Sequence, residues 1–371
     1  MTIRHRFFLI AMLLIIPAAI VFGPGFGLSL PENTQTLASG SYFAYLDNHI
    51  RESFPFQDLM RRISIRTGLL SGRSMQNDIF ISREGLIKNI PAPNPQALRA
   101  NIEAIIAFSE HVDRPIYFVL IPTSSAILQQ MLPQYAQIYN NQRQLIEDVY
   151  RETGRYVVPI NVYPVLFNRR SQYIYYRTEN NLTSLGGFYV YSALAGRLGI
   201  PARNASLDRY DISYPVRRYF GNLHALSPYS AVRPDELMTF HLAHEDRMYT
   251  VTHMNAGEVR TYYTLYPTHL AELGREMDIF FGGVSAITRI ESSVPGRSIL
   301  VLGDHTALSY IPFLAGNYQR VTLVDVMSLT SENLNDIRPG RYHQILIAYS
   351  VQTFNSEKSN FKELLLEIAV R

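Results

Sequence analysis

The sequence predicts an α/β fold built around a mainly parallel sheet. Continuous apolar runs, the pattern of strands buried on both faces, occur at residues 116–121, 298–302, 321–325 and 344–349. A shorter strand is expected at 156–160. Amphipathic helical patterns separate or follow these strands, among them 98–106, 133–152, 308–318 and the stretch from 357 to the end. Strands that alternate with amphipathic helices are typical of a parallel sheet covered by helices.

The composition excludes two classes of protein. The 371 residues are 47% hydrophobic, with 34 Lys+Arg against 31 Asp+Glu and a net charge of +3. Such a chain is too apolar to be intrinsically disordered and too weakly charged for a strongly basic nucleic-acid binder. It has no cysteine, which excludes disulfides, thiolate metal sites and a cysteine nucleophile.

The N-terminus predicts a transmembrane signal-anchor and an extracytoplasmic body. Arg4 and Arg6 precede an unbroken apolar run at 7–22, which a mostly apolar extension to Leu28 lengthens enough to span a bilayer. Positive charge before the run and none just after it places the N-terminus in the cytoplasm. A cleaved signal peptide and a buried core helix are the alternatives. A single anchor without cysteines suits a bacterial cell envelope.

The chain is expected to divide into three regions. Residues 1–30 form a cytoplasmic tip and the anchor, 31–95 a linker and an N-terminal helical segment, and 96–371 the α/β domain. Between about 201 and 291 the alternation of strands and helices fails, and short strand-like pieces rich in Tyr, His and Arg replace it. We interpret this stretch as a β-containing insertion.

Polar residues follow two predicted strands, at the edge where open parallel sheets bind ligands. Thr123 follows the first buried strand, and Asp304, His305 and Thr306 follow the strand that ends near Gly303. A nucleophile or an anion-binding loop is often placed at such a strand–helix junction. In the alternative interpretation Gly303 turns the chain, Asp304 caps the helix and His305 is simply exposed.

A second polar cluster precedes a helix expected from Leu185. It contains Arg177, Glu179, Asn180 and Asn181. A capped helix start would explain these residues equally well.

Two further clusters lie in the insertion. His241, His244 and Glu245 have a spacing that could bring both imidazoles to one helical face, but no zinc signature is complete, so we expect no metal and no cofactor. The stretch 209–219 interleaves Arg and Tyr. An ordinary solvated edge is the simpler interpretation of it, and a surface for anionic glycan is the alternative.

Short segments in a defined order carry a resemblance to a known family. They are Pro31-Glu32-Asn33, 54–58, 77–81, 84–86, 120–123, 132–133, 220–223, 280–283, 299–304, 312–314 and 324–325. At these positions, over roughly residues 30–350, the chain resembles the DHHW family of exported proteins. That family is similar to SGNH hydrolases and related to the proteins of alginate O-acetylation. The resemblance implies a three-layer SGNH-hydrolase-like domain.

Both motifs of the family are degenerate in this chain. The segment 179–183, Glu-Asn-Asn-Leu-Thr, stands at the place of Asp-His-His-Trp-Thr, and Gly-Asp-His at 303–305 stands at the place of Gly-Asp-Ser. The resemblance assigns the triad roles of the acetylation relatives to Glu179, Asn181 and His305. However, His305 has no hydroxyl to acylate, and Asn181 cannot act as a general base. Losing both leaves at most the residual catalysis of binding groups.

The resemblance therefore implies an inactive, membrane-anchored protein of a cell-envelope polysaccharide modification or assembly system. Its expected partners are a cell-surface polysaccharide or a membrane acyltransferase, with no nucleic acid. An active acyl esterase or O-acetyltransferase that uses Thr306 with His305 is the alternative, and a structural envelope protein without a ligand is a third possibility. The residues expected to bind are Asp304, Arg177, Asn180 and Thr123.

Overall fold

The computed structural model forms two compact units. It describes residues 63, 65–69, 75–82, 84–133, 136, 141–243, 247–255, 257–325, 328–329, 337–356 and 361–369. One unit comprises residues 1–73 and 227–230, and the other 74–226 and 231–371. The predicted anchor lies outside the described residues. Within the described ranges, no helix combines the length and apolar character needed to cross a membrane.

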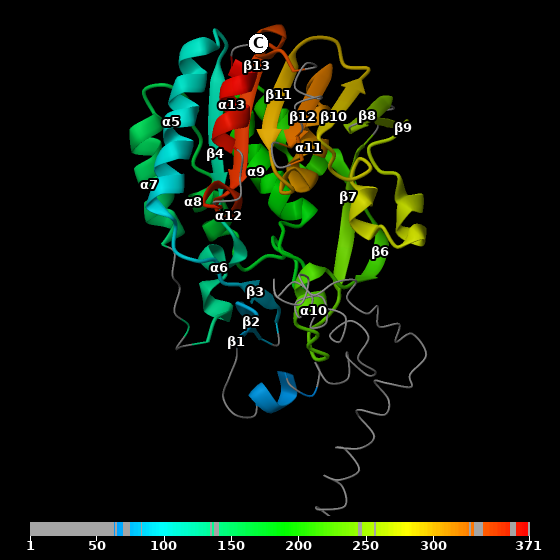
Figure 1. Ribbon diagram of the computed structural model, residues 1–371. Coiled ribbons are helices and arrows are strands. Elements are labelled where there is room, and N and C mark those ends of the chain that lie inside the picture. The colour runs from blue at the N-terminus through cyan, green and yellow to red at the C-terminus, as the bar shows by residue number, and fades with distance from the viewer. Residues whose placement is uncertain are drawn as a thin grey trace, which may run out of the picture. The chain divides into compact units, whose positions relative to one another are not determined.

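A mixed eight-stranded sheet forms the centre of the larger unit (Figure 1). Its strands, in spatial order, are β5 (Val158–Pro159), β4 (Ile116–Ile121), β13 (Gln344–Ser350), β11 (Ser298–Gly303), β12 (Arg320–Asp325), β10 (Ile287–Ser292), β8 (Tyr249–Asn255) and β9 (Glu258–Tyr262). The first five strands are parallel, and the last three pair antiparallel. The predicted α/β fold is confirmed. The sheet is mixed rather than mainly parallel, because strands of the predicted insertion extend one edge of it.

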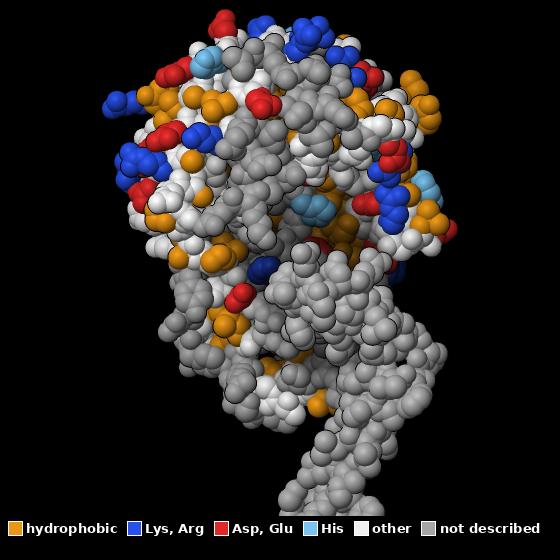
Figure 2. Space-filling model, viewed as in Figure 1, with side chains coloured by type: hydrophobic (Ala, Val, Ile, Leu, Met, Phe, Trp, Pro, Cys, Tyr) orange, Lys and Arg blue, Asp and Glu red, His pale blue; other side chains and the backbone are white. Residues whose placement is uncertain are grey.

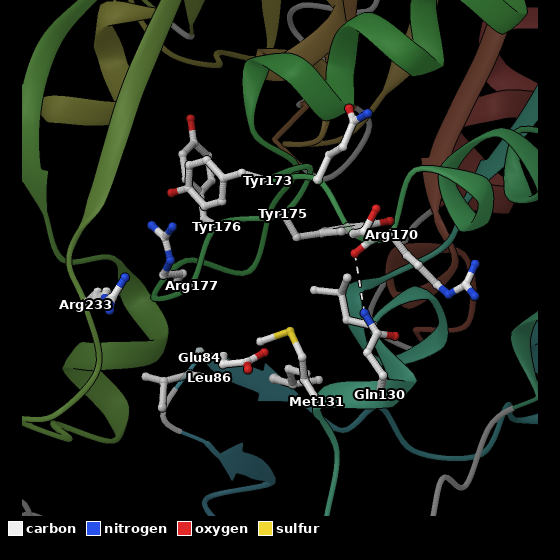
Figure 3. Close-up of a pocket in the computed structure, with 15 residues that line it drawn as sticks. Glu84, Leu86, Gln130, Met131, Arg170, Tyr173, Tyr175, Tyr176, Arg177 and Arg233 are labelled. Carbon is white, nitrogen blue, oxygen red and sulfur yellow. Dashed lines mark hydrogen bonds between the residues drawn. The ribbon is translucent and has the colours of Figure 1, made fainter.

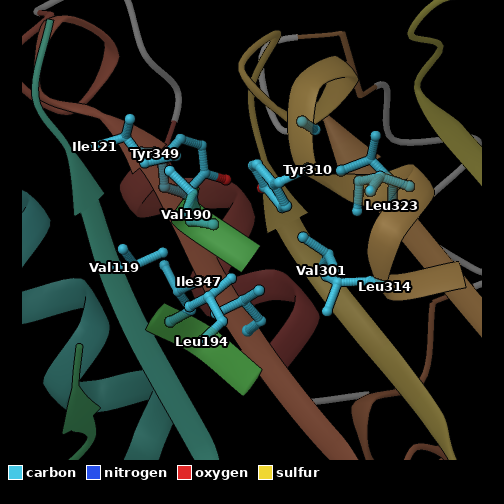
Figure 4. Close-up of a cluster of buried hydrophobic side chains, with 14 of the residues drawn as sticks. Val119, Ile121, Val190, Leu194, Val301, Tyr310, Leu314, Leu323, Ile347 and Tyr349 are labelled. Atoms are coloured by element: carbon cyan, nitrogen blue, oxygen red, sulfur yellow. The ribbon is translucent and has the colours of Figure 1, made fainter. Parts of the chain in front are cut away.

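Helices α9 (Ser184–Arg197) and α11 (Ala307–Ala315) cover one face of this sheet. Figure 4 shows Val190 and Leu194 of α9, together with Tyr310 of α11, gathered against strand residues that include Val119 and Val301. All of these side chains are buried. The continuous apolar runs of the central strands form this core because both faces of the sheet are covered.

The opposite face is covered by α5 (Pro95–His111), α7 (Gln142–Thr153), α12 (Val351–Phe354) and α13 (Phe361–Ala369) (Figure 1). Phe118, which alternates with Val119 along β4, points to this side and contacts the rings of Tyr150 in α7 and Phe354 in α12. The main sheet and the helices on its two faces therefore form three layers.

Two helix starts show how far local sequence signals can locate the first residue of a helix. Asn94 caps α5 through hydrogen bonds from the amides of Gln96 and Ala97, and Pro95 follows it at the first helical position, a combination typical of a helix start. The helix expected from Pro133 begins only at Gln142 and is capped by Asn141. The predicted start was therefore wrong, because Asn141 offers the later cap.

Smaller elements surround the sheet. Two minor sheets are formed by β1 (Met75–Gln76), β2 (Ile79–Ile81) and β3 (Leu86–Lys88), and by β6 (Tyr210–Tyr219) and β7 (Asp235–Leu242). Short α-helices are α6 (Ser124–Ile127), α8 (Tyr163–Asn168) and α10 (Asn222–Leu226). Short 3₁₀ turns occur at Gln129–Met131, Ala202–Ala205, Leu207–Arg209, Thr268–Leu273, Glu276–Ile279 and Pro339–Arg341.

The sheet of β1, β2 and β3 lies in a stretch for which the sequence predicted no strands. The amide of Leu86 in β3 donates to the carbonyl of Arg177 at 2.7 Å. This bond joins the small sheet to the loop that precedes α9, and the larger unit accordingly begins at residue 74.

Candidate functional site

A polar cavity of about 330 Å³ lies where β4, β11 and β13 end, and we call it the strand-end cavity. Seven of the eight predicted site residues line it: Thr123, Glu179, Asn180, Asn181, Asp304, His305 and Thr306. Arg177 is the one that does not. Ser124, Gln352 and Thr353 also line the cavity.

Asp304 uses both of its carboxylate oxygens to hold the backbone. Oδ1 accepts from the amide of Thr306 at 3.0 Å and from its hydroxyl at 2.5 Å, while Oδ2 accepts from the amide of Ser350 at 2.9 Å. The side chain is 5% exposed. Asp304 therefore ties the end of β11 to the end of β13 and fixes the turn before α11. It is not the helix cap of the alternative interpretation, because the N-cap residue of α11 is Thr306 and no side-chain capping bond is formed there.

The side chain of Asn181 is hydrogen-bonded to the main chain of His305, not to its imidazole. The Asn181 side-chain amide donates to the carbonyl oxygen of His305 at 3.1 Å, and its own oxygen accepts from the amide of Leu182. The His305 side chain is exposed and makes no hydrogen bond with any described residue. The hydroxyl of Thr306 is bonded to Asp304 and not to this imidazole.

Glu179 is buried against the start of α10. Its Oε2 accepts from the Tyr219 hydroxyl at 3.0 Å and from the Asn222 amide at 2.8 Å, and its Oε1 accepts from the Asn180 amide at 2.9 Å. A Cβ atom at Gly221 would lie only 2.5 Å from this side chain, so the approach requires glycine. Burial, followed by the nearby carboxylate, raises the pKa of Tyr219 and keeps its phenol protonated as the donor.

Two of the remaining polar groups are already engaged. The hydroxyl of Thr123 accepts from Nε2 of Gln142 at 2.7 Å, and the Asn180 amide donates to Oε1 of Gln352 at 2.9 Å. Ser124 makes no side-chain hydrogen bond with a described residue. Ser124 lies in the polar segment after β4 to which the sequence already points, whereas Gln352, two residues after the end of β13, was not singled out. Its position after a strand that ends at the cavity was the available signal.

Comparison with known proteins identifies the family. The family model described as DHHW protein matches residues 100–324, more than half of the chain. The chain belongs to the DHHW family. No curated protein matches the sequence.

Solved structures share the DHHW fold. A DHHW family protein from Eubacterium siraeum aligns with a TM-score of 0.62 and 17% identity, covering 77% of this chain and 97% of that one. PatB1 from Bacillus cereus, solved with a sulfonyl adduct, aligns with a TM-score of 0.59 and 16% identity, covering 77% and 96%. At such identities the similarity shows the fold alone.

The predicted Arg177 lies in a second, larger cavity of about 540 Å³, which we call the arginine cavity (Figure 3). A fully buried carboxylate, Asp235, organises its wall. This carboxylate accepts from the amides of Arg177 and Thr178 at 2.6 and 2.8 Å and from the hydroxyls of Thr178 and Tyr173. The sequence does not single out Asp235, because these donors are far from it in the chain.

The structure describes only part of the histidine cluster at 241–245 of this DHHW protein, and it describes the whole Arg- and Tyr-rich stretch at 209–219. His241 in β7 contacts the hydroxyl of Thr239 at 3.0 Å, whereas His244 and Glu245 lie outside the described residues. Within the described part, no group of three or more His, Asp or Glu side chains could hold a metal ion. The Arg- and Tyr-rich stretch lies along β6, most of whose residues are exposed. Basic and acidic side chains are interspersed over the face in Figure 2.

Proposed function

We propose that this chain is an exported DHHW protein that takes part in modifying or assembling a cell-envelope polysaccharide. It binds glycan, or a partner acyltransferase, at the strand-end cavity and does not itself transfer acyl groups. An N-terminal anchor at residues 7–28 holds it at the membrane, a proposal that rests on the charge and hydropathy of that segment.

One observation carries the proposed loss of catalysis. The Thr306 hydroxyl donates to Asp304, and His305, the one histidine among the described residues that line the cavity, is bonded to no hydroxyl. Acyl transfer needs a nucleophile within hydrogen-bond reach of a general base. Asp304 already accepts from two backbone amides as well as from this hydroxyl, which suits a structural role.

The lining of the cavity supports a sugar ligand. Asn180, Gln352, Ser124 and Thr353 supply neutral amides and hydroxyls, which can both donate to and accept from the hydroxyls of a sugar. The relation of DHHW proteins to alginate O-acetylation proteins supports a polysaccharide in particular. Fold alone does not determine function, so the ligand requires a direct test.

The test of catalysis is p-nitrophenyl acetate hydrolysis by the purified full-length chain. We expect wild type, Thr306→Val, His305→Gln and Ser124→Ala to release nitrophenolate at the same rate, because no activated nucleophile is present. The exposed Ser293, which does not line the cavity, supplies the control variant Ser293→Ala.

A rate above buffer that falls about 100-fold or more in a cavity variant, with Ser293→Ala unaffected, would show an active enzyme. Loss in both Thr306→Val and His305→Gln would favour the acyl esterase or O-acetyltransferase alternative. Loss in Ser124→Ala alone would instead identify a nucleophile at the end of β4.

A further inference from the structure

We propose that the arginine cavity binds an anionic group of the sugar chain whose neighbouring unit occupies the strand-end cavity. This inference rests on the proposed glycan binding and adds the chemical class of the glycan, a polymer that bears carboxylates or phosphates. Arg177 and Arg233 are the residues assigned to the anion.

Arg177 is held in place before any ligand binds. Its guanidinium carbon lies 4.2 Å from the ring centre of Tyr173, and Nη1 lies 3.4 Å from the carbonyl oxygen of Pro234. The side chain remains 30% exposed. A guanidinium that is already positioned loses little conformational freedom when it binds an oxyanion.

Arg233 supplies a second, uncommitted charge. It is exposed, lines the same cavity and forms no hydrogen bond or ion pair with a described residue. Figure 3 shows Arg177 and Arg233 on the same side of the cavity, with Glu84 lower in the view. Two guanidinium groups on one wall can present several donors to one carboxylate or phosphate.

The charge around the arginine cavity is positive. Three arginines, including Arg170, and one carboxylate, Glu84, line it. The buried Asp235 lies 3.9 Å from Arg177, but its oxygens also accept from two amides and two hydroxyls, so it does not engage Arg177 alone. A net positive charge remains when both carboxylates are counted.

Neighbouring cavities share lining residues, an arrangement that would suit a chain-like ligand. Tyr175 lines both the arginine cavity and the strand-end cavity, and its hydroxyl is fixed by a 2.6 Å bond to the carbonyl of Pro122. A third cavity of about 570 Å³ shares Gln352 and Thr353 with the strand-end cavity. Three adjoining cavities can accommodate successive units of a polymer, whereas a single small metabolite would need only one.

Calorimetric titration of the full-length chain with three short oligosaccharides tests the inference. The probes are an oligogalacturonate, the neutral oligogalactoside of the same linkage and a phosphorylated oligogalactoside. We expect an acidic probe to bind more tightly than the neutral one, and Arg233→Gln to weaken the acidic complex about threefold to tenfold. Arg155→Gln, which removes the same charge from an exposed site outside the cavities, should leave affinity unchanged.

The outcomes separate the two proposals. A larger effect on the oligogalacturonate or on the phosphorylated probe identifies which anion the site prefers. Equal binding of neutral and acidic probes, or equal losses in Arg233→Gln and Arg155→Gln, would overturn the anion site and leave glycan binding intact. If none of the three probes binds, the proposed glycan binding fails as well.

Discussion

Polar residues at the strand-end cavity hold neighbouring loops together through side-chain hydrogen bonds. The carboxylate oxygens of Asp304 accept hydrogen bonds from Thr306 and Ser350, and the side-chain amide of Asn181 donates to the carbonyl oxygen of His305. Replacing a histidine by asparagine removes the titratable nitrogen but keeps a donor that can fix a neighbouring loop. These positions of the motif therefore have a structural role at the cavity.

Among single side chains, we expect Asp235 to contribute most to the free energy of unfolding. Asp235→Asn replaces one acceptor oxygen by a donor, so at least one of its four fully or partly buried donors faces another donor. An unsatisfied buried group costs about 1–3 kcal/mol, and loss of the charge adds to this, so we expect a loss of roughly 2–4 kcal/mol in the free energy of unfolding. Urea denaturation followed by circular dichroism measures it.

Asp113→Asn is the matched control, because Asp113 is exposed and makes no side-chain bond with a described residue. It should change the unfolding free energy by less than about 0.5 kcal/mol. Equal stabilities of the Asp113 and Asp235 variants would show that the carboxylate does not organise the wall of the arginine cavity.

Among the elements, burial decided which ones the sequence could predict. Strands β4, β11, β12 and β13 lie within a residue or two of their predicted ranges, because strands covered on both faces require continuous apolar runs. Strand β8 contains both buried and half-buried residues, so its Tyr-Thr-Val-Thr-His sequence shows no continuous apolar run that would predict a strand. Strands β1 to β3 contain two or three residues each and are too short to show periodicity.

Packing between α9 and α11 gives the clearest element-scale prediction. A Cβ atom at Gly187 would lie 2.0 Å from the carbonyl oxygen of Ser309, so Gly187→Ala must push the helices apart. Overpacking of this kind costs about 1–3 kcal/mol and outweighs the roughly 1 kcal/mol that alanine gains in a helix. We expect a lower melting temperature in differential scanning calorimetry.

Gly196 in the same helix is the control for this substitution. It is exposed, and a Cβ atom there would meet nothing within 4 Å, so Gly196→Ala should raise stability by up to about 1 kcal/mol. If both substitutions stabilise the protein, the close helix contact is absent.

For the molecule as a whole, the sequence predicted which polar residues come together better than it predicted their bonding. The rule that ligands bind at strand ends singled out Thr123 and the 304–306 turn, while the family motif added residues 179–181. Their meeting depends on β13 pairing with both β4 and β11, and such long-range pairing leaves no local mark in the sequence. Arg177 lines the arginine cavity instead, because Asp235, which is distant in the sequence, accepts a hydrogen bond from the Arg177 amide and fixes the backbone at that position.

The proposed location of the whole chain depends on the segment before the described residues. If residues 7–28 anchor the protein, alkaline carbonate should leave the full-length chain in the membrane pellet, and protease added to spheroplasts should digest its body. Leu14→Arg places a charge in the apolar run at a cost of about 2.5–3.5 kcal/mol, so membrane retention should fall, while Leu14→Ile should behave as wild type. A shortened chain released into the medium would show a cleaved signal peptide instead, and a full-length chain recovered in the cytosol would contradict export altogether.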